Sequence, residues 1–316
     1  MASSARQHLV RLDQRLVDAG CYASRAAAQQ AIRAGSVRVD TRTVSKPGAL
    51  VPAAAAIEIL APPHPYASRG GAKLACALDA FAVLPQGRLC LDSGVSTGGF
   101  TDCLLQRGAA AVIAVDVGYG QIAWRLRCDS RVALLERTNL RYLTRSALVA
   151  LAAPGGPLAE LGWRPSLVTL DLSFISLRLL FAPLAELLAT RDSDAAPVDM
   201  VALVKPQFEV GPERVGKGGI VRDAEDQRLA LVRVTEAAQE AGLRPRAYCE
   251  SPLRGGASTP QDRGNREFFL YATWGGPGGG GTADVGSMVA PESLEAAAAA
   301  VVTSSVPQLM DLERVR

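Results

Sequence analysis

RLCLDSGVSTGGFTDCLLQRG, residues 88–108, is the stretch that decides the fold of this chain. It reads as a short apolar strand ending in Asp92, then a glycine-containing turn, then a helix. A buried strand that leads through such a turn into a helix is the cofactor-binding unit of doubly wound α/β proteins. The glycines allow a bound molecule to approach the backbone, and the start of the helix favours a carboxylate or phosphate. The stretch therefore predicts a cofactor site.

The next apolar run, AAVIAVDVG, ends in Asp116, which follows Gly94 by 22 residues. This separation is close to that between a glycine turn and a ribose-binding acid in nucleotide-binding folds. The turn has the spacing GxxxGG rather than GxGxxG, which argues against a dinucleotide site. Taken alone, the turn is compatible with NAD, a flavin or S-adenosyl-L-methionine.

Further strands are predicted in PSLVTLDLSF (165–174), DMVALVKPQF (199–208) and FFLYATW (268–274). Because these runs alternate with helical patterns, we expect an α/β fold with a Rossmann-like, doubly wound, mostly parallel sheet. Ligands of such sheets bind outside the carboxyl ends of the strands. The residues predicted to lie at those ends are Asp92, Asp116, Asp171 and Lys205.

The composition supports one large domain with a smaller one attached. The chain has 316 residues, 48% of them hydrophobic, and a net charge of +3. Residues 1–60 carry eight Arg or Lys against four acids, so the amino-terminal part is cationic, as suits phosphate binding. The six cysteines form no CxxC pair and the two histidines do not cluster, so no metal site is predicted. With no apolar signal segment or membrane span, we expect a cytoplasmic protein that does not bind membranes.

Residues 9–60 read as two short helices, ending at Gly20 and Gly35, followed by a hairpin. The phrases RLD, SR, IRAGSVRV and VSKPG make this segment resemble the S4-type RNA-binding domain. The predicted boundaries are an S4-like domain at 1–60, a proline-rich linker at 61–67, a catalytic domain at 68–274 and a flexible linker and tail at 275–316. The residues that the resemblance assigns to RNA binding are Arg11, Arg25, Arg33, Arg38 and Lys46.

Four polar residues lie inside distinctive phrases: Lys73 in SRGGAKL, Asp171 in LDLSFIS, Lys205 in VKPQFEVG and Glu267 in GNREFFLY. Together with VDVGYGQIAWRLR and LERTNLR, these phrases resemble the TlyA family of hemolysin-named ribosomal RNA 2′-O-methyltransferases, whose catalytic body is FtsJ-like. The resemblance covers about residues 9–272 and implies methylation of cytidine ribose in ribosomal RNA or ribosomal subunits, with S-adenosyl-L-methionine as cofactor. It assigns the cofactor site to Asp92, Gly94, Ser96, Thr97, Gly98, Asp116, Val117 and Asn139.

The same resemblance makes Lys73, Asp171, Lys205 and Glu267 a catalytic tetrad. A ribose hydroxyl is a very weak acid, so the enzyme must align it with the methyl donor and remove one proton. Our hypothesis is that Lys205 orients the hydroxyl or acts as base and that Asp171 positions Lys205. Lys73 and Glu267 would hold the ribose and each other.

Three other functions compete with that of a methyltransferase. A non-catalytic RNA-binding or ribosome-assembly factor would keep the cationic amino-terminal domain but would not transfer methyl groups. A membrane-lytic hemolysin needs long apolar or amphipathic segments, whereas this chain places charges at strand ends. An NAD oxidoreductase needs hydride-acceptor chemistry, of which the sequence shows no sign. The sequence carries no signal of oligomeric state.

Overall fold

The computed structural model describes residues 8–22, 24–33, 35–60, 65–189, 196–255 and 264–275, together with 298, 302 and 310–311. The chain divides into two compact units, Met1–Arg69 and Gly70–Arg316. Each unit has its own hydrophobic core. The two are therefore described separately.

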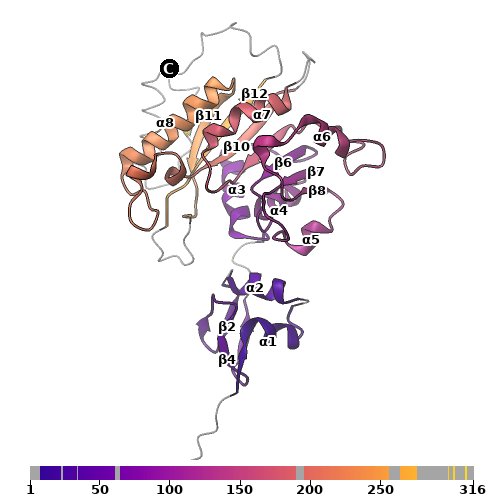
Figure 1. Ribbon diagram of the computed structural model, residues 1–316, viewed down its shortest axis with the longest axis vertical. Helices are drawn as coiled ribbons and strands as arrows, with labels where there is room; N and C mark the ends of the chain where they lie inside the picture. The colour runs from indigo at the N-terminus through magenta and orange to yellow at the C-terminus, as the bar shows by residue number, and fades with distance from the viewer. Residues whose placement is uncertain are drawn as a thin grey trace, which may run out of the picture. The chain divides into compact units, whose positions relative to one another are not determined.

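The amino-terminal unit is a small α+β domain (Figure 1). Leu12, Leu16 and Ile32 of its two helices are fully buried against Val37. The two helices and the hairpin predicted from the sequence are present, with further short strands that pair antiparallel as β1 with β4 and as β3-β2-β5. Its elements are β1 (Leu9–Arg11), α1 (Leu12–Asp18), α2 (Arg25–Arg33), β2 (Val37–Val39), β3 (Arg42–Thr43), β4 (Leu50–Pro52) and β5 (Ile57–Ile59).

The larger unit is built on one sheet, in which the described strands follow the order β13-β11-β12-β10-β9-β6-β7-β8. The five strands from β10 to β8 are parallel, β12 runs antiparallel to β10, and β11 and β13 continue antiparallel at the edge. The predicted Rossmann-like, mostly parallel sheet is thus confirmed. The strands are β6 (Leu89–Ser93), β7 (Ala111–Val115), β8 (Val132–Leu135), β9 (Leu167–Leu170), β10 (Val198–Val204), β11 (Arg244–Glu250), β12 (Phe268–Trp274) and β13 (Met310–Asp311).

Helices cover both faces of this sheet. Phe181 of α7 and Leu231 of α8 belong to the core cluster on one face, which contains Leu91 and Val168. On the other face, Phe100 of α4 stacks on Phe269 with ring centroids 6.2 Å apart. The helices are α3 (Arg69–Ala80), α4 (Gly99–Gln106), α5 (Trp124–Arg127), α6 (Arg145–Leu151), α7 (Phe181–Leu188) and α8 (Ala224–Glu240), with 3₁₀ turns η1 (Leu140–Tyr142), η2 (Leu177–Leu179), η3 (Pro206–Phe208) and η4 (Pro212–Arg214).

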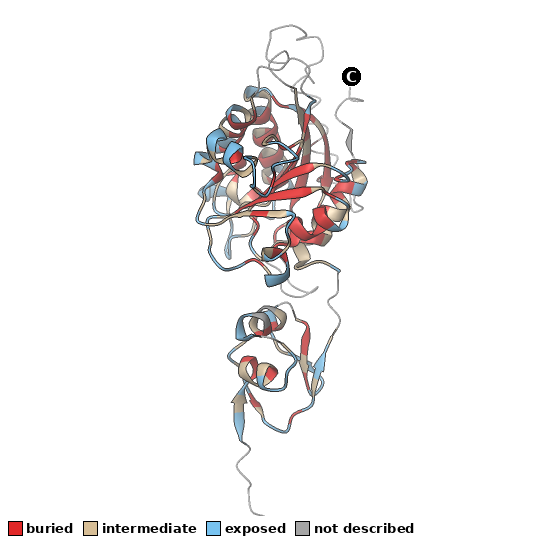
Figure 2. Ribbon diagram, turned by 90° about the vertical axis from the view of Figure 1, so that its right-hand side faces the viewer, coloured by how far each residue is buried: buried red, intermediate tan, exposed pale blue. Residues whose placement is uncertain are grey.

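Three of the predicted strands are buried on both sides. Every residue of β6, β7 and β9 is buried, as Figure 2 shows, and such strands read as continuous apolar runs. The sequence pattern does not predict strands β8 and β11. Charged residues or a proline lie beside or within their apolar residues and hide the pattern. The tail also contributes: Met310–Asp311 pairs with β11, and Ala298 and Val302 are buried.

Candidate active site

Two buried ion pairs lie at the carboxyl edge of the parallel strands. Lys73 Nζ donates a hydrogen bond to Glu267 Oε2 at 2.5 Å. Lys205 Nζ lies 2.8 Å from Asp171 Oδ1. The four residues predicted as one set therefore occur as two pairs, each of which joins segments that are distant along the chain.

The sheet topology explains why these residues share one edge. Asp171 directly follows β9 and Lys205 directly follows β10, and the two strands are parallel neighbours. Glu267 directly precedes β12, which is antiparallel to β10. Because the register pairs Val204 with Phe268, the end of β10 and the start of β12 coincide. Lys73 reaches this edge from α3.

Both lysines are largely removed from solvent. The side chains of Lys73 and Lys205 are 12% and 10% exposed. Charges at this depth are stable only when they are paired and hydrogen-bonded. Lys205 Nζ meets this requirement twice, since it also donates to Ser173 Oγ at 2.8 Å. Ser173 was not predicted, although it stands two residues after Asp171 inside the same quoted phrase.

The glycine turn packs directly against the backbone of Asp171. Gly94 has φ +88°, and a Cβ atom at this position would lie 2.3 Å from the Asp171 carbonyl oxygen. The Asp171 N–H also donates to the Ser93 carbonyl at 2.9 Å. Only glycine fits here, because a side chain would push the two loops apart. The predicted cofactor turn and the Lys205–Asp171 pair are thus parts of one packed unit.

Asp116 holds the loops around the turn. Its carboxylate accepts hydrogen bonds from the Ser96 N–H at 2.6 Å and the Gly118 N–H at 2.7 Å. Its backbone carbonyl accepts from the Thr138 N–H at 2.9 Å, which places Asn139 beside it. The structure therefore brings Ser96, Asp116 and Asn139 together. Val117, which follows Asp116, is 68% exposed, and Thr97 and Gly98 complete the turn before α4.

Asp92 differs from the other predicted cofactor residues because it is completely buried. Thr101 Oγ1 of α4 donates to one carboxylate oxygen at 2.6 Å, and Thr169 Oγ1 of β9 donates to the other at 3.0 Å. Burial, with a smaller contribution from the charge of Asp171, raises the pKa of Asp92 to about 7. The side chain ties β6 to α4 and β9 rather than lining the open edge.

The loop after β9 carries a further exposed group that the sequence did not reveal. Phe174 is 92% exposed and has φ +65°, in the left-handed region that a phenylalanine rarely adopts. Its ring centroid lies 5.5 Å from that of Phe208. Glu209 fixes the same loop, because its buried carboxylate accepts from Ser176 Oγ at 2.5 Å and from the Leu177 N–H at 2.9 Å. Burial raises the pKa of Glu209.

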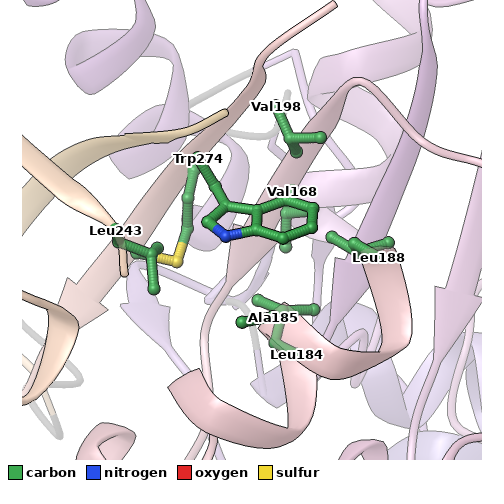
Figure 3. Close-up of a pocket in the computed structure, with 8 residues that line it drawn as sticks. Val168, Leu184, Ala185, Leu188, Val198, Leu243 and Trp274 are labelled. Carbon is green, nitrogen blue, oxygen red and sulfur yellow. The ribbon is translucent and has the colours of Figure 1, made fainter. Parts of the chain in front are cut away.

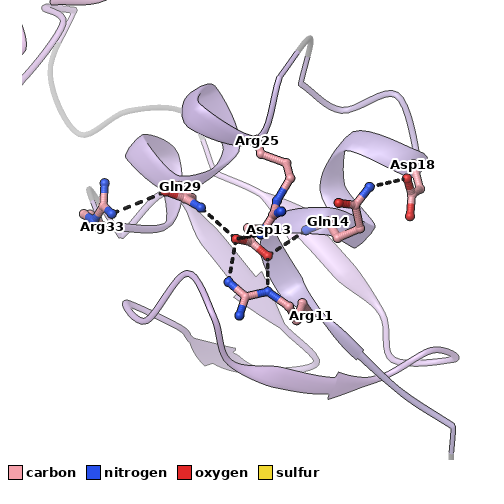
Figure 4. Close-up of polar contacts among 7 residues, drawn as sticks. All are labelled: Arg11, Asp13, Gln14, Asp18, Arg25, Gln29 and Arg33. Atoms are coloured by element: carbon pink, nitrogen blue, oxygen red, sulfur yellow. Dashed lines mark hydrogen bonds and ion pairs between the residues drawn. The ribbon is translucent and has the colours of Figure 1, made fainter. Parts of the chain in front are cut away.

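In the amino-terminal unit, the main polar feature is the carboxylate of Asp13 (Figure 4). This fully buried group accepts hydrogen bonds from Arg11 at 2.9 and 3.0 Å, from Arg25 at 3.0 Å and from Gln29 at 2.8 Å. These donors hold the pKa of Asp13 well below its usual range, with the Arg11 hydrogen bonds as the main cause. Arg11 and Arg25 remain about half exposed, so they both stabilise the unit and face outward.

The other predicted RNA-binding residues are more loosely held. Arg33 donates to Gln29 at 3.4 Å, and Arg38 lies 3.3 Å from Glu58 with both side chains exposed. Lys46 is exposed. Exposed ion pairs of this kind contribute little to stability, so these cations can exchange their partners for phosphates at small cost.

An apolar pocket lies at the opposite edge of the sheet (Figure 3). It is lined by Val198, Leu184 and Trp274, among others. Val198 begins β10 and pairs with Trp274 at the end of β12, so the pocket is at the amino ends of the parallel strands. Its lining has no titratable group. We therefore place the active site at the carboxyl edge instead.

Known proteins and family models match both units of this chain. The model of the FtsJ-like methyltransferase family matches residues 66–272, and the S4 domain model matches residues 10–57. The 16S/23S rRNA (cytidine-2′-O)-methyltransferase TlyA of Mycobacterium tuberculosis is 44% identical over 83% of this chain and 88% of its own length. Hemolysin A of Brachyspira hyodysenteriae is 32% identical over 83% of this chain and 99% of its own.

A solved structure of a candidate hemolysin from Streptococcus thermophilus superposes with a TM-score of 0.62 at 33% identity, covering 93% of this chain and 96% of its own. Fold and sequence together define an FtsJ-like methyltransferase that carries an S4 domain. Within that class, the chain belongs to the TlyA family. Every helix in the described part of the chain is too short or too polar to cross a membrane.

The pKa of Asp92 leads to a prediction about stability and pH. Between about pH 4, where a carboxyl group of the unfolded chain ionises, and about pH 7, the folded protein keeps a proton that the unfolded chain has lost. The free energy of unfolding therefore decreases as pH rises through this window. Asp92→Asn removes this decrease. As pH rises through the window, the free energy of unfolding of the variant should therefore increase relative to that of wild type by up to about 1.4 kcal/mol per pH unit.

Urea unfolding of both proteins at several pH values across this window measures the difference. Asp79→Asn is the control, since its ion pair with Arg107 lowers the pKa of Asp79, so any effect on stability should be constant across the window and change with pH only below it. A difference between Asp92→Asn and wild type that is independent of pH would contradict a proton held by Asp92.

The Asp13 cluster predicts a local loss of stability. Asp13→Ala removes the shared acceptor of two guanidinium groups and an amide, which should destabilise the amino-terminal unit by about 2 kcal/mol. Hydrogen exchange of the full chain should show faster exchange in residues 8–60 and no change in residues 65–189. Asp18→Ala is the matched control, because exposed Asp18 accepts only from Gln14 at 2.8 Å among the described contacts. Equal effects of the two substitutions would rule out the cluster as the stabilising feature.

Proposed function

We propose that this protein transfers the methyl group of S-adenosyl-L-methionine to the ribose 2′-hydroxyl of a cytidine in ribosomal RNA. The observation that carries the proposal is the buried Lys205 ammonium, fixed by Asp171 and Ser173 beside the glycine turn. The printed activity of the M. tuberculosis relative supports the substrate.

The residues at the turn fit the cofactor. Gly94 and Gly98, directly before α4, form a turn in which a side chain could not be accommodated. Asp116 offers a half-buried carboxylate to ribose hydroxyl groups, and Asn139 lies next to it. When bound, S-adenosyl-L-methionine supplies a methyl group made electrophilic by a positively charged sulfur. We assign Asp92 to holding the turn in place, since both of its oxygens are already occupied by threonine hydroxyls.

Lys205 is the residue that orients the nucleophile. An ammonium group has three N–H donors, and two of them are directed at Asp171 and Ser173. The third is left for the oxygen of the substrate hydroxyl. When the hydroxyl is methylated, its proton passes to the Asp171 carboxylate, which is the member of the ion pair that can accept a proton and the more exposed of the two.

Lys73 and Glu267 bind the rest of the ribose. Their ion pair is short and only 12% and 3% exposed, so it forms a rigid wall of the site. Phe174 presents an exposed ring on the loop that also bears Asp171 and Ser173. Unstacked bases of RNA bind to such aromatic faces. We assign Phe174 to stacking on the base of the nucleotide whose ribose is methylated.

The amino-terminal unit is proposed to bind structured RNA through its arginines. Arg11 and Arg25 face outward from a rigid cluster, while Arg33, Arg38 and Lys46 add exposed charge. Contacts of this kind bind phosphates and carry little sequence information. The S4 unit would therefore supply affinity for ribosomal RNA, and the catalytic unit would select the nucleotide.

Lys205→Ala tests the proposal. Incorporation of labelled methyl groups into purified ribosomal subunits should fall by about 10²–10⁴-fold, because the hydroxyl loses the group that orients it and Asp171 loses the ammonium that holds it in place to accept the proton. Binding of S-adenosyl-L-methionine, measured by calorimetry, should be unchanged, since Lys205 does not belong to the turn. Lys205→Arg keeps the charge but stays protonated, so its activity separates an orienting role from a base. Wild-type rates in Lys205→Ala, or no heat of cofactor binding in the wild type, would refute the proposal.

A further inference from the structure

A short hairpin beside the active site has no role in the function proposed above. Residues 215–222, VGKGGIVR, are called the basic hairpin here. The Gly216 N–H donates to the Ile220 carbonyl at 3.0 Å, and the Gly219 N–H donates back to Gly216 at 3.0 Å. Gly218 and Gly219 have φ of +81° and +75°, as this tight turn requires. A Cβ atom on either would meet nothing within 4 Å, so the tip projects into open space with Lys217 exposed on it.

The base of the basic hairpin is rigidly built. Val210, Val221 and Ala230 form a small hydrophobic core of their own, and Val215 packs against it. Buried Asn265 accepts from the Val221 N–H at 2.8 Å and donates to the Gly219 carbonyl at 2.7 Å. The small core and the two hydrogen bonds of the buried Asn265 side chain therefore hold the hairpin in one position. Such order in an exposed loop is what a preorganised binding element needs.

Both supports of the basic hairpin come from segments that carry active-site residues. Asn265 stands two residues before Glu267, and its backbone is bridged to Gly255 by hydrogen bonds of 2.9 and 3.0 Å. Gly255 in turn lies against the Glu267 carboxylate, because a Cβ atom there would be 1.8 Å from Oε1. On the other side, the chain reaches the hairpin from Lys205 through η3 and η4. The hairpin therefore borders the Lys73–Glu267 side of the site.

The charge of the basic hairpin points to an anionic partner. Lys217 and Arg222 are exposed, and neither has an ion-pair partner among the described residues. The Arg222 guanidinium lies alongside the turn, since a Cβ on Gly216 would be 3.4 Å from its Nη1. Nearby acids are already engaged: Asp226 pairs with Arg214 at 2.5 Å, Glu225 pairs with Arg228 at 2.8 Å, and Asp223 caps α8. Glu213 folds back against Gly211.

We infer that the basic hairpin is an RNA clamp, in which Lys217 and Arg222 bind backbone phosphates of the strand that adjoins the methylated ribose. This inference rests on the proposed function, because it takes RNA as the substrate. It adds a second phosphate-binding element, on the catalytic unit itself and distinct from the S4 domain. Its role is to hold the strand next to the target nucleotide while Lys73 and Glu267 hold the sugar.

The double variant Lys217→Ala/Arg222→Ala tests the clamp. With the ribosomal subunit that the wild type methylates, KM for RNA should rise about tenfold while kcat stays unchanged. Loss of two phosphate contacts should also lower the slope of log(kcat/KM) against log salt by about 1.4. Affinity for S-adenosyl-L-methionine should not change. The charge-preserving variant Lys217→Arg/Arg222→Lys should behave like wild type.

Arg244→Ala is the matched control, because exposed Arg244 begins β11 at the opposite edge of the sheet. An unchanged KM and salt slope in the double variant would overturn the clamp and leave the proposed function intact. So would a higher KM with an unchanged salt slope, or a fall in kcat alone, since neither reflects lost phosphate contacts. Absence of methyl transfer by the wild type would instead refute the proposed function.

Discussion

The buried ammonium group of Lys205 must be paired with hydrogen-bond acceptors, and the arrangement of β9, β10 and the loop after β9 supplies them. Asp171 and Ser173 supply them from the loop after β9, at 2.8 Å each. An unpaired charge at this depth would cost several kcal/mol, so β9 and β10 must end together and the loop must stay in place. Glu209 secures the far side of the same loop through Ser176 and Leu177. The ion pair is therefore supported from both the sheet and the loop.

The glycine turn is coupled to this ion pair by close packing. Gly94 touches the Asp171 carbonyl, and Asp92 links β6 to β9 through Thr169 and to α4 through Thr101. Movement of the turn would therefore move the residue that holds Lys205. In a methyltransferase this coupling has a clear use, because donor and acceptor atoms must be aligned within a fraction of an ångström for efficient transfer.

The two elements proposed to bind RNA use cations in different ways. In the S4 unit, Arg11 and Arg25 share Asp13, so the basic surface is also what holds the small domain together. In the basic hairpin, Lys217 and Arg222 have no acidic partner among the described residues, and stability comes instead from a separate core around Val221. A domain of about fifty residues has little core of its own, which is the physical reason for giving its arginines a structural task as well.

Much of this arrangement was predictable because apolar runs, glycines and charged strand ends are local signals. They predicted the strand–turn–helix at 88–108, the mostly parallel sheet and the two-helix amino-terminal domain. They also placed Asp171 and Lys205 at strand ends, where parallel neighbours bring them together. Strands β8 and β11 were not predicted, because charges beside or within a strand hide its apolar pattern.

The sequence by itself determined the type of fold and the side chains available for chemistry, since periodicity and residue type are properties of short segments. Only the tertiary structure decided that Ser173 binds Lys205, that Asp92 is buried and that Phe174 is exposed. It also decided that the basic hairpin adjoins Glu267. These facts depend on strand register and loop packing, which join residues up to 194 positions apart and have no signal in any one segment.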